Sequence, residues 1–360
     1  ASSGSQNVTG AATGDNAAAP GSRNPLQLFR RSRDKMAQRI GRRNLAWLRV
    51  LAAEAWGTFM IVLSGCGSVA ASFTGAYKGI FQVAVVWGLG VAFAIYQTEH
   101  ISGAHLNPAV SLTNLFWRPE SFDFPRIFGG PRKQQPLLSR GPAWRDPVYL
   151  KRCAQFVLAQ YVGAIAAGAV NLWIHGPSIR AFERGAGLVR GEESSILTAS
   201  AFGEYFPNPG MNADHVDGGF FRGSDVDVWR ALATEAAGTF LLVVHIYGLT
   251  HGKRVAANPA LKPAIPFLIG FFVCMLLMLF APYTQAGWNP ARDFGPRLVA
   301  FLAGWGPVAL PGRRHGWWIY QLGPLIGAFL GGAFSDYTLY GESDEVQEAD
   351  GIPGVEEAAV

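Results

Sequence analysis

The sequence predicts an all-α membrane protein with six transmembrane helices, two re-entrant half-helices and an inverted internal repeat. The chain has 360 residues, of which 49% are hydrophobic and 15% charged, whereas soluble domains are about a quarter charged. Asn-Pro-Ala occurs twice, at Asn107 and at Asn289, 182 residues apart. The string E-A-W-G-T-F at Glu54 recurs as E-A-A-G-T-F at Glu235, 181 residues on. Two motifs repeated in register indicate a duplicated chain.

Six apolar stretches come close to the ~20 residues that a helix needs to cross a bilayer. We expect these spanning helices at about 50–71, 79–99, 149–173, 229–250, 263–282 and 315–336. The 44 glycines suit close helix packing in lipid. Gly323, Gly327 and Gly331 recur every four residues in the sixth stretch, so one face of that helix allows close approach.

The net charge of +5 does not indicate nucleic-acid binding, because most of the positive charges lie in segments between the predicted spans. Twenty of the 30 Lys and Arg residues lie in 1–49, 118–152 and 253–262, which six spans place on one side of the membrane. The positive-inside rule then predicts that both termini are cytoplasmic. We expect the lipid bilayer, and no nucleic acid, as a partner.

The chain divides into a membrane domain and two tails. We expect a disordered basic cytoplasmic tail at 1–46, a membrane domain at 47–337 and an acidic cytoplasmic tail at 338–360. Within the domain, repeats at about 47–173 and 229–337 flank a large polar external loop at 174–228. The Arg-rich part of the first tail fits either contact with anionic headgroups or a transit segment.

The segments 100–117 and 283–304, each around one Asn-Pro-Ala, are too short to span and read as re-entrant loops with half-helices. Asn is a preferred N-cap and Pro a preferred first helical residue, so each motif predicts a helix start. Two half-helix N-termini that meet near the midplane repel cations and protons. The amides of Asn107 and Asn289 can donate hydrogen bonds to a neutral solute.

Four further residues carry chemistry in apolar surroundings. Arg292 lies at membrane depth, where a charge indicates function. Glu54 and Glu235 lie in separate apolar helices, which argues against acid–base catalysis; we expect each to accept hydrogen bonds from a re-entrant loop. His105 is expected to order its loop, since no second metal ligand lies at a suitable spacing.

The strings S-G-A-H-L-N-P-A-V at 102–110 and N-P-A-R-D-F-G-P-R at 289–297 resemble the aquaporin superfamily, and within it the aquaglyceroporin branch. The resemblance runs from about Ala46 to Tyr337. Asp293 follows Arg292 as it does in that branch, and Y-F-P-N-P at 205–209 is similar as well. The resemblance implies an aquaporin-like fold, a homotetramer with one pore per protomer, and a plasma-membrane or organellar location.

The resemblance also assigns the site. It implies a pore constriction at Asn107 and Asn289 and loop support from Glu54, Glu235, His105 and Asp293. It implies a selectivity filter at Trp87, Leu277, Ala286 and Arg292. Trp87 with small or apolar partners would form a wide, half-apolar slot that suits polyols.

Two departures from the branch bear on selectivity. Glycerol facilitators usually carry Phe or Tyr where Ala286 stands, so the filter is expected to be wider or differently shaped, and Trp288 could swing into the gap. They also carry Pro and an aliphatic residue where Tyr320 and Gln321 stand.

The expected function is a passive channel for glycerol, other small neutral solutes and water that excludes protons and ions. The alternatives are a mainly water-selective aquaporin and, less favoured, a coupled transporter, which would need a chain of intramembrane acids. An enzyme is not expected, because no nucleophile–base set occurs. Cys66, Cys153 and Cys274 are scattered in apolar segments, so neither a metal nor another cofactor is expected.

Overall fold

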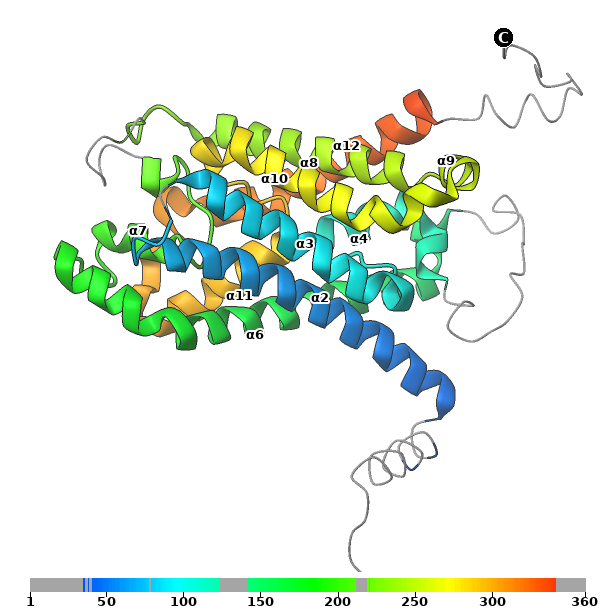
Figure 1. Ribbon diagram of the computed structural model, residues 1–360, viewed down its shortest axis with the longest axis horizontal. Coiled ribbons are helices and arrows are strands. Elements are labelled where there is room, and N and C mark those ends of the chain that lie inside the picture. Colours follow the sequence, from blue (N-terminus) through cyan, green and yellow to red (C-terminus); the bar gives the residue numbers. More distant parts are fainter. Residues whose placement is uncertain are drawn as a thin grey trace, which may run out of the picture. The chain divides into compact units, whose positions relative to one another are not determined.

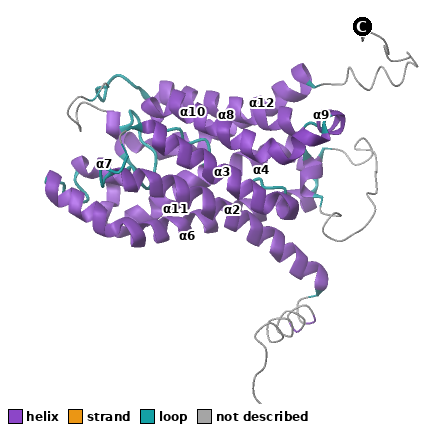
Figure 2. Ribbon diagram, in the orientation of Figure 1, coloured by secondary structure: helices purple, strands orange, loops and turns teal. Residues whose placement is uncertain are grey.

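The structure is a computed structural model that describes residues 35, 38, 41–77, 79–123, 142–211, 219 and 221–340. Contacts divide the chain into two units, Ala1–Trp47 and Leu48–Val360. The site and the fold described below lie in the second, except for the start of helix α2 at Arg42–Trp47. The predicted tails at 1–46 and 338–360 lie mostly outside the described residues. Figure 2 shows helices joined by loops, and no strand lies in the described part of the chain.

In the described residues of the first half there are three long helices and one short one. They are α2 (Arg42–Ser72), α3 (Ile80–Ser102), α4 (Pro108–Trp117) and α6 (Pro147–Ala186). Two 3-10 turns, Pro119–Phe122 and Ala143–Arg145, lie between α4 and α6. Asp146 begins α6, because its carboxylate accepts a hydrogen bond from the Val148 N–H at 2.8 Å.

The second half repeats this order. Its main helices are α8 (Val228–Thr250), α10 (Ile265–Thr284), α11 (Pro290–Ala300) and α12 (Ile319–Phe334), with the short helices α7 (Ile196–Ala199) and α9 (Gly252–Ala257). Short helical turns lie at Glu193–Ser195, Pro209–Met211, Pro259–Ala264, Phe301–Trp305, Gly306–Val308, Arg313–Trp318 and Ser335–Leu339. Repeat-related helices therefore pair as α2 with α8, α3 with α10, α4 with α11 and α6 with α12.

The two halves meet where α3 packs against α10 (Figure 1). A Cβ atom on Gly88 would overlap the carbonyl oxygen of Gly270, and a Cβ atom on Gly270 would overlap that of Gly88. These two residues are 182 positions apart, which is the repeat distance. Equivalent residues touch each other only on the axis that relates two copies. The contact therefore places a pseudo-two-fold axis between α3 and α10.

Each of the six predicted spans lies in a helical segment. Among the described residues, five helices are long and apolar enough to cross a membrane: Asn44–Ser72, Ile80–Ser102, Pro147–Ala186, Val228–Thr250 and Pro259–Thr284. The sixth predicted span contains α12, which has 16 residues, and helical turns of other types at Arg313–Trp318 and Ser335–Leu339 extend it. Six helical segments and two half-helices are the predicted arrangement.

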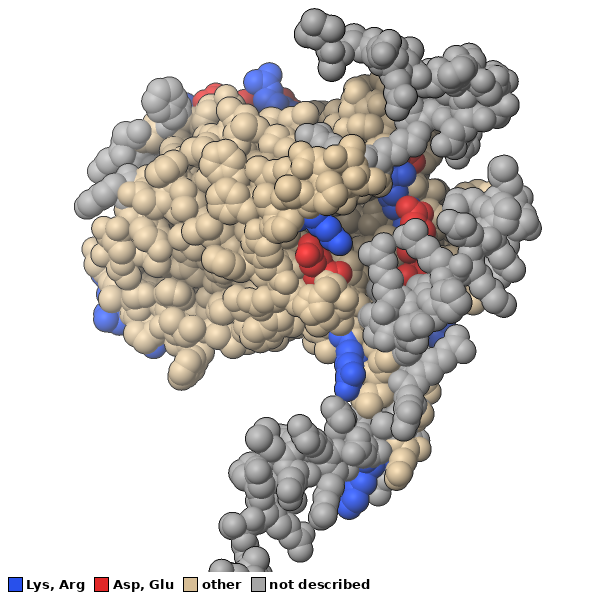
Figure 3. All heavy atoms as spheres, turned by 45° about the vertical axis from the view of Figure 1, so that its right-hand side comes forward, with Lys and Arg blue, Asp and Glu red and all other residues tan. Residues whose placement is uncertain are grey.

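Large apolar side chains cover the outer wall of the helices. Phe81, Leu158, Trp173, Trp229 and Phe271 each expose between 60% and 81% of their surface. In Figure 3, uncharged residues cover most of the helical wall that faces the viewer, and few charged side chains are in view there. Such a surface is stable in contact with hydrocarbon but not with water.

The predicted external loop at 174–228 differs from expectation. Helix α6 continues to Ala186, so part of the predicted loop is helical. Residues 198–207 are buried, although the sequence suggested a polar loop on the surface. Phe202 and Tyr205 pack there against Trp305 and Ala309. Composition of the whole segment conceals this buried core, because its charged residues lie on either side of an apolar stretch.

The glycine face of α12 packs against α8, as its four-residue spacing predicts. Cβ atoms at Gly323, Gly327 and Gly331 would all meet atoms of α8 closer than van der Waals distance. At Gly327 the obstacle is the main-chain carbonyl of Ala236, which cannot move aside as a flexible side chain can. The corresponding contact in the first half joins Gly163 of α6 to the Ala55 carbonyl of α2.

We predict that Gly327→Ala lowers the free energy of unfolding by about 1–3 kcal/mol, because the added methyl group separates α8 from α12. Gly185→Ala is the matched control, since Gly185 is helical and has no atom within 4 Å of the Cβ position. Thermal unfolding of both variants in detergent measures the difference. Equal midpoints for the two variants would contradict the prediction.

Candidate functional site

Both half-helices begin at their Asn-Pro-Ala motif, as the sequence predicts. The Oδ1 atom of Asn107 accepts a hydrogen bond from the Ala109 N–H at 2.9 Å, and Pro108 is the first residue of α4. The Oδ1 atom of Asn289 accepts from the N–H groups of Ala291 at 3.1 Å and Arg292 at 3.2 Å. Each Asn side chain is thus an N-cap that fixes the direction of its amide group.

The two caps are joined across the pseudo-two-fold axis. The Nδ2 atom of Asn107 donates to the Trp288 carbonyl at 2.8 Å, and Nδ2 of Asn289 donates to the Leu106 carbonyl at 2.9 Å. These two bonds are equivalent under the repeat. They bring the N-termini of α4 and α11, and therefore the positive ends of two helix dipoles, to one place in the interior of the molecule.

The loops before the caps bend in the same way. Ala104 and Leu106 have φ angles of 52°, and their repeat mates Ala286 and Trp288 have φ angles of 66° and 45°. Left-handed backbone is unfavourable for residues with a side chain, so it persists only where the surroundings hold it. The bends turn successive peptide N–H groups to one side, toward a buried carboxylate.

Glu54 and Glu235 are those carboxylates. Glu54 accepts hydrogen bonds from the N–H groups of His105 at 3.0 Å and Leu106 at 2.8 Å. Glu235 accepts from the N–H groups of Gly287 at 3.0 Å and Trp288 at 2.9 Å. Both glutamates are fully buried. These are the contacts that a supporting role requires, because a loop at membrane depth has no water to satisfy its N–H groups.

Glu54 has two further donors, both of them side chains. Ser102 Oγ donates to Glu54 at 2.5 Å, and Gln160 Nε2 donates at 2.8 Å. Gln160 also donates to Ser111 Oγ at 2.9 Å. The first re-entrant loop is therefore tied to α6 as well as to α2.

His105 lies within this polar network. Asn114 Nδ2 is 3.1 Å from Nε2 of His105, and Asn114 Oδ1 accepts from the Tyr247 hydroxyl at 2.8 Å. Because an amide nitrogen only donates, Nε2 of His105 is the acceptor and Nδ1 carries the hydrogen. Nδ1 lies 3.2 Å from Ser111 Oγ. Its ring thus connects the loop to α4, and no cluster of three or more metal-ligating side chains occurs in the part of the chain that the structure describes.

Of the four predicted filter residues, Arg292 contacts both Trp87 and Ala286. The guanidinium carbon of Arg292 is 4.1 Å from the ring centre of Trp87, and its Nη2 donates to the Ala286 carbonyl at 3.1 Å. Trp87, Leu277 and Ala286 belong to one buried cluster. Ala286 thus holds the Arg292 side chain through its main-chain carbonyl oxygen. A residue with a larger side chain at position 286 would provide the same carbonyl.

Sequence reasoning missed Glu204, which forms an ion pair with Arg292 and is 5% exposed. Its N–H donates to Asp293 Oδ1 at 2.8 Å, and its carbonyl accepts from Arg297. The next N–H, of Tyr205, donates to Gln285 Oε1 at 2.9 Å. The signal in the sequence was a single acid in the otherwise apolar and aromatic run A-S-A-F-G-E-Y-F at 199–206.

Asp293 is the residue that holds α11 and the loop around Glu204 together. Besides Glu204, it binds Arg297 Nη2 at 2.7 Å in a fully buried ion pair. Gln321 Nε2 lies 3.4 Å from Asp293 Oδ2, and Gln321 Oε1 accepts from the Tyr161 hydroxyl at 2.9 Å. The unusual Gln321 is therefore part of the support for Asp293.

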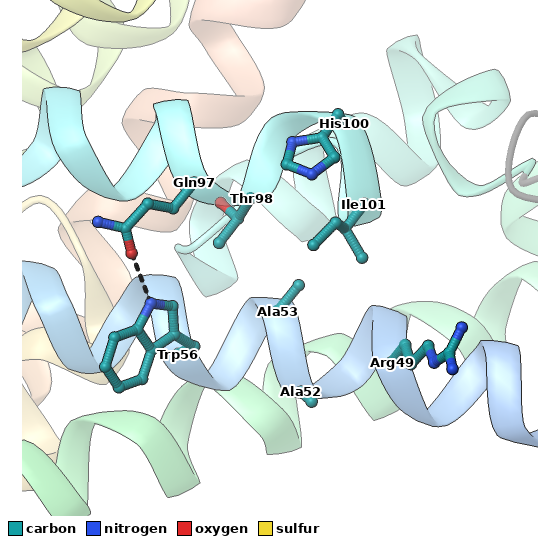
Figure 4. Close-up of a pocket in the computed structure, with 8 residues that line it drawn as sticks. All are labelled: Arg49, Ala52, Ala53, Trp56, Gln97, Thr98, His100 and Ile101. Atoms are coloured by element: carbon teal, nitrogen blue, oxygen red, sulfur yellow. Dashed lines mark hydrogen bonds between the residues drawn. The ribbon is translucent and has the colours of Figure 1, made fainter. Parts of the chain in front are cut away.

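A separate hollow opens on the outer surface between α2 and α3 (Figure 4). The Trp56 indole lies at one end of it and donates to Gln97 Oε1 at 2.6 Å. Its lining residues are Arg49, Ala52, Ala53, Trp56, Gln97, Thr98, His100 and Ile101. None of the predicted constriction or filter residues is among them, so this hollow is not part of the candidate pathway.

Comparison with known proteins identifies the family. Residues 42–124 and 143–334 match the model of the major intrinsic protein family. The chain belongs to this family. It is 32% identical over 282 residues to the glycerol uptake facilitator protein of Pseudomonas aeruginosa. The aligned residues cover 78% of this chain and 84% of the relative.

Other members give the same picture. The chain is 35% identical over 293 residues to the glycerol uptake facilitator protein of Escherichia coli K12, covering 80% of this chain and 87% of the relative. It is 31% identical over 289 residues to the propanediol uptake facilitator PduF of Salmonella typhimurium, covering 79% and 91%. The X-ray structure of the aquaglyceroporin from Plasmodium falciparum superposes with a TM-score of 0.60 at 21% identity, covering 82% and 97%. This last likeness shows a shared fold, and the chain is an integral, multi-pass membrane protein.

We predict that Glu54→Leu lowers the free energy of unfolding by several kcal/mol, because each buried donor left without a partner costs about 1–3 kcal/mol. Glu54→Gln keeps one acceptor oxygen and is expected to cost less. Chemical or thermal unfolding in detergent ranks the two variants. Similar losses for Leu and Gln would mean that the hydrogen bonds at Glu54 do not support the loop.

Proposed function

We propose that the protein is a passive pore for glycerol, other small uncharged polyols and water, and that it excludes protons and ions. The observation that carries the proposal is the reciprocal pair of Asn caps at the meeting point of two half-helices. The names of the relatives support the choice of solute, because they are uptake facilitators for glycerol and propanediol.

Asn107 and Asn289 form the constriction. A carboxamide has two N–H groups, and one in each residue is engaged in the cross-axis bond. The second N–H of each is offered to an oxygen atom that passes between them. The positive ends of α4 and α11 make this point unfavourable for a cation or a hydrated proton, while a neutral hydroxyl group binds and leaves.

Trp87, Leu277, Ala286 and Arg292 form the filter, and we add Glu204 to it. The Trp87 face and Leu277 offer apolar surface to the carbon atoms of a polyol, while Arg292 donates to its oxygens. A hydroxyl group also has a hydrogen to donate, and the Glu204 carboxylate beside Arg292 is an acceptor for it. Arg292 and Glu204 thus offer a donor to the oxygen and an acceptor to the hydrogen of a hydroxyl group. Together they leave little net charge at this end of the proposed pore, which we call the mouth.

We also propose that the protein is a homotetramer in the plasma membrane, with both termini in the cytoplasm. The orientation is supported by the 20 Lys and Arg residues that lie at 1–49, 118–152 and 253–262. The tetramer and the membrane are implied by the family resemblance. Cross-linking in native membranes and protease access to tagged termini test these points separately.

The proposed function predicts fast, unsaturable re-swelling of proteoliposomes in glycerol, measured by stopped-flow light scattering. Arg292→Val places the residue of the repeat-related position, Val110, at the filter. We expect this variant to lower the ratio of glycerol to urea permeability about tenfold, because hydrogen bonds to a charged group are lost. Water flow without glycerol entry in the wild type would contradict the proposed solute, and dependence on an ion gradient would indicate a transporter.

We predict that Glu204→Gln raises the permeability to a small anion such as formate while it changes glycerol permeability little. The variant keeps the shape and an acceptor oxygen but leaves Arg292 as an uncompensated positive charge. Glu193→Gln is the control. Glu193 lies in the loop at 174–228, its side chain is largely exposed, and it pairs with Arg313 and not with Arg292. Equal formate permeability in wild type and Glu204→Gln would contradict the role assigned to the ion pair.

A further inference from the structure

Trp288, the residue directly before Asn289, is held by its peptide groups on both sides. Its N–H donates to Glu235 at 2.9 Å, and its carbonyl accepts from Asn107 Nδ2 at 2.8 Å. Its φ angle of 45° is left-handed. The bonds that build the proposed constriction therefore also fix where the Trp288 side chain begins.

The indole ring is packed on two sides. On one side it lies on Gly238 of α8, where any Cβ atom would overlap its Nε1 and ring carbons. On the other, Phe280 of α10 meets it edge-on, with ring centres 6.0 Å apart and an interplanar angle of 89°. The ring is 4% exposed and belongs to the same buried cluster as Trp87, Leu277 and Ala286.

The first half shows what this position looks like without an indole. Leu106 is the repeat mate of Trp288, and its side chain lies on Gly57 as Trp288 lies on Gly238. Gly57 and Gly238 are themselves 181 positions apart. The architecture therefore needs only an apolar group of leucine size here, and the larger aromatic ring with its N–H is an addition peculiar to the second half.

That N–H group has no hydrogen-bond partner among the described residues. Neither Gly238 nor the Phe280 ring edge offers an acceptor to it. Buried donors are nearly always paired, and an unpaired one is costly. A hydroxyl oxygen that passes the Asn pair is an acceptor of the right kind, and the peptide groups of Trp288 adjoin both caps.

We propose that Trp288 is a specificity-determining residue: its indole supplies the aromatic wall that Ala286 does not, and Nε1–H donates a hydrogen bond to a polyol hydroxyl beside the Asn pair. This inference rests on the proposed function. A solute with more hydroxyl groups gains more from a third donor next to Asn107 and Asn289. The pore therefore favours glycerol over a diol of similar size.

The test compares glycerol with 1,2-propanediol, which has one hydroxyl group fewer, in proteoliposomes that contain the full chain. Trp288→Phe keeps an aromatic ring and removes the N–H, and it is expected to lower the glycerol to propanediol permeability ratio about fivefold, the size of one neutral hydrogen bond. Trp56→Phe is the matched control, because it removes an indole N–H on the outer surface. Its ratio is expected to equal that of the wild type.

Trp288→Leu, which copies Leu106, is a second variant without the N–H and is expected to lower the ratio as well. Osmotic water permeability shows which variants are inserted and folded. An unchanged ratio in Trp288→Phe, or in Trp288→Leu if only that variant inserts, overturns the inference. Wild-type liposomes without glycerol flux would instead overturn the proposed function and, with it, this inference, so the two failures are distinguishable.

Discussion

The structure depends on one constraint: peptide N–H groups at membrane depth must find partners inside the protein. The loops before Asn107 and Asn289 run through the interior without regular structure, and each presents two N–H groups to a buried glutamate. With the loops fixed in left-handed bends, each Asn caps its own half-helix and also bonds to the opposite loop. Glu54 and Glu235 thus support the two loops through which the helix N-termini are joined.

The scaffold is nearly symmetric, whereas the chemistry added to it is not. Repeat-related positions carry Val110 and Arg292, Ser111 and Asp293, and Leu106 and Trp288. In each pair the second half has the charged or aromatic member. The loop that carries Glu204 binds to α11, so it completes the candidate site on that side of the axis. The duplicated helices thus form a symmetric scaffold, whereas the charged and aromatic residues of the candidate site lie mainly on the second half.

The elements that local chemistry determines were predictable. Apolar length indicated the spans, and the capping preferences of Asn and Pro indicated α4 and α11. Helix α6 was predicted too short, because hydropathy reports contact with lipid and not where a helix stops; α6 ends at Ala186, before Gly187 with its φ of 66°. Glu204 was missed because its role arises from contacts with Asp293, Arg297 and Arg292, which lie about 90 residues away in sequence.

The buried charges at the mouth explain how an arginine can remain at this depth. An unpaired guanidinium inside a protein is strongly unfavourable, and a single ion pair repays little beyond its desolvation. Here Arg292 and Arg297 are matched by Glu204 and Asp293, and the carbonyls of Ala286 and Glu204 accept further hydrogen bonds. In the proposed pore these four charges sum to zero, so the mouth would not be the main electrostatic barrier to cations. The barrier to cations and protons would fall instead to the positive ends of the two helix dipoles at the Asn pair, so that the mouth could select neutral solutes by shape and hydrogen bonding.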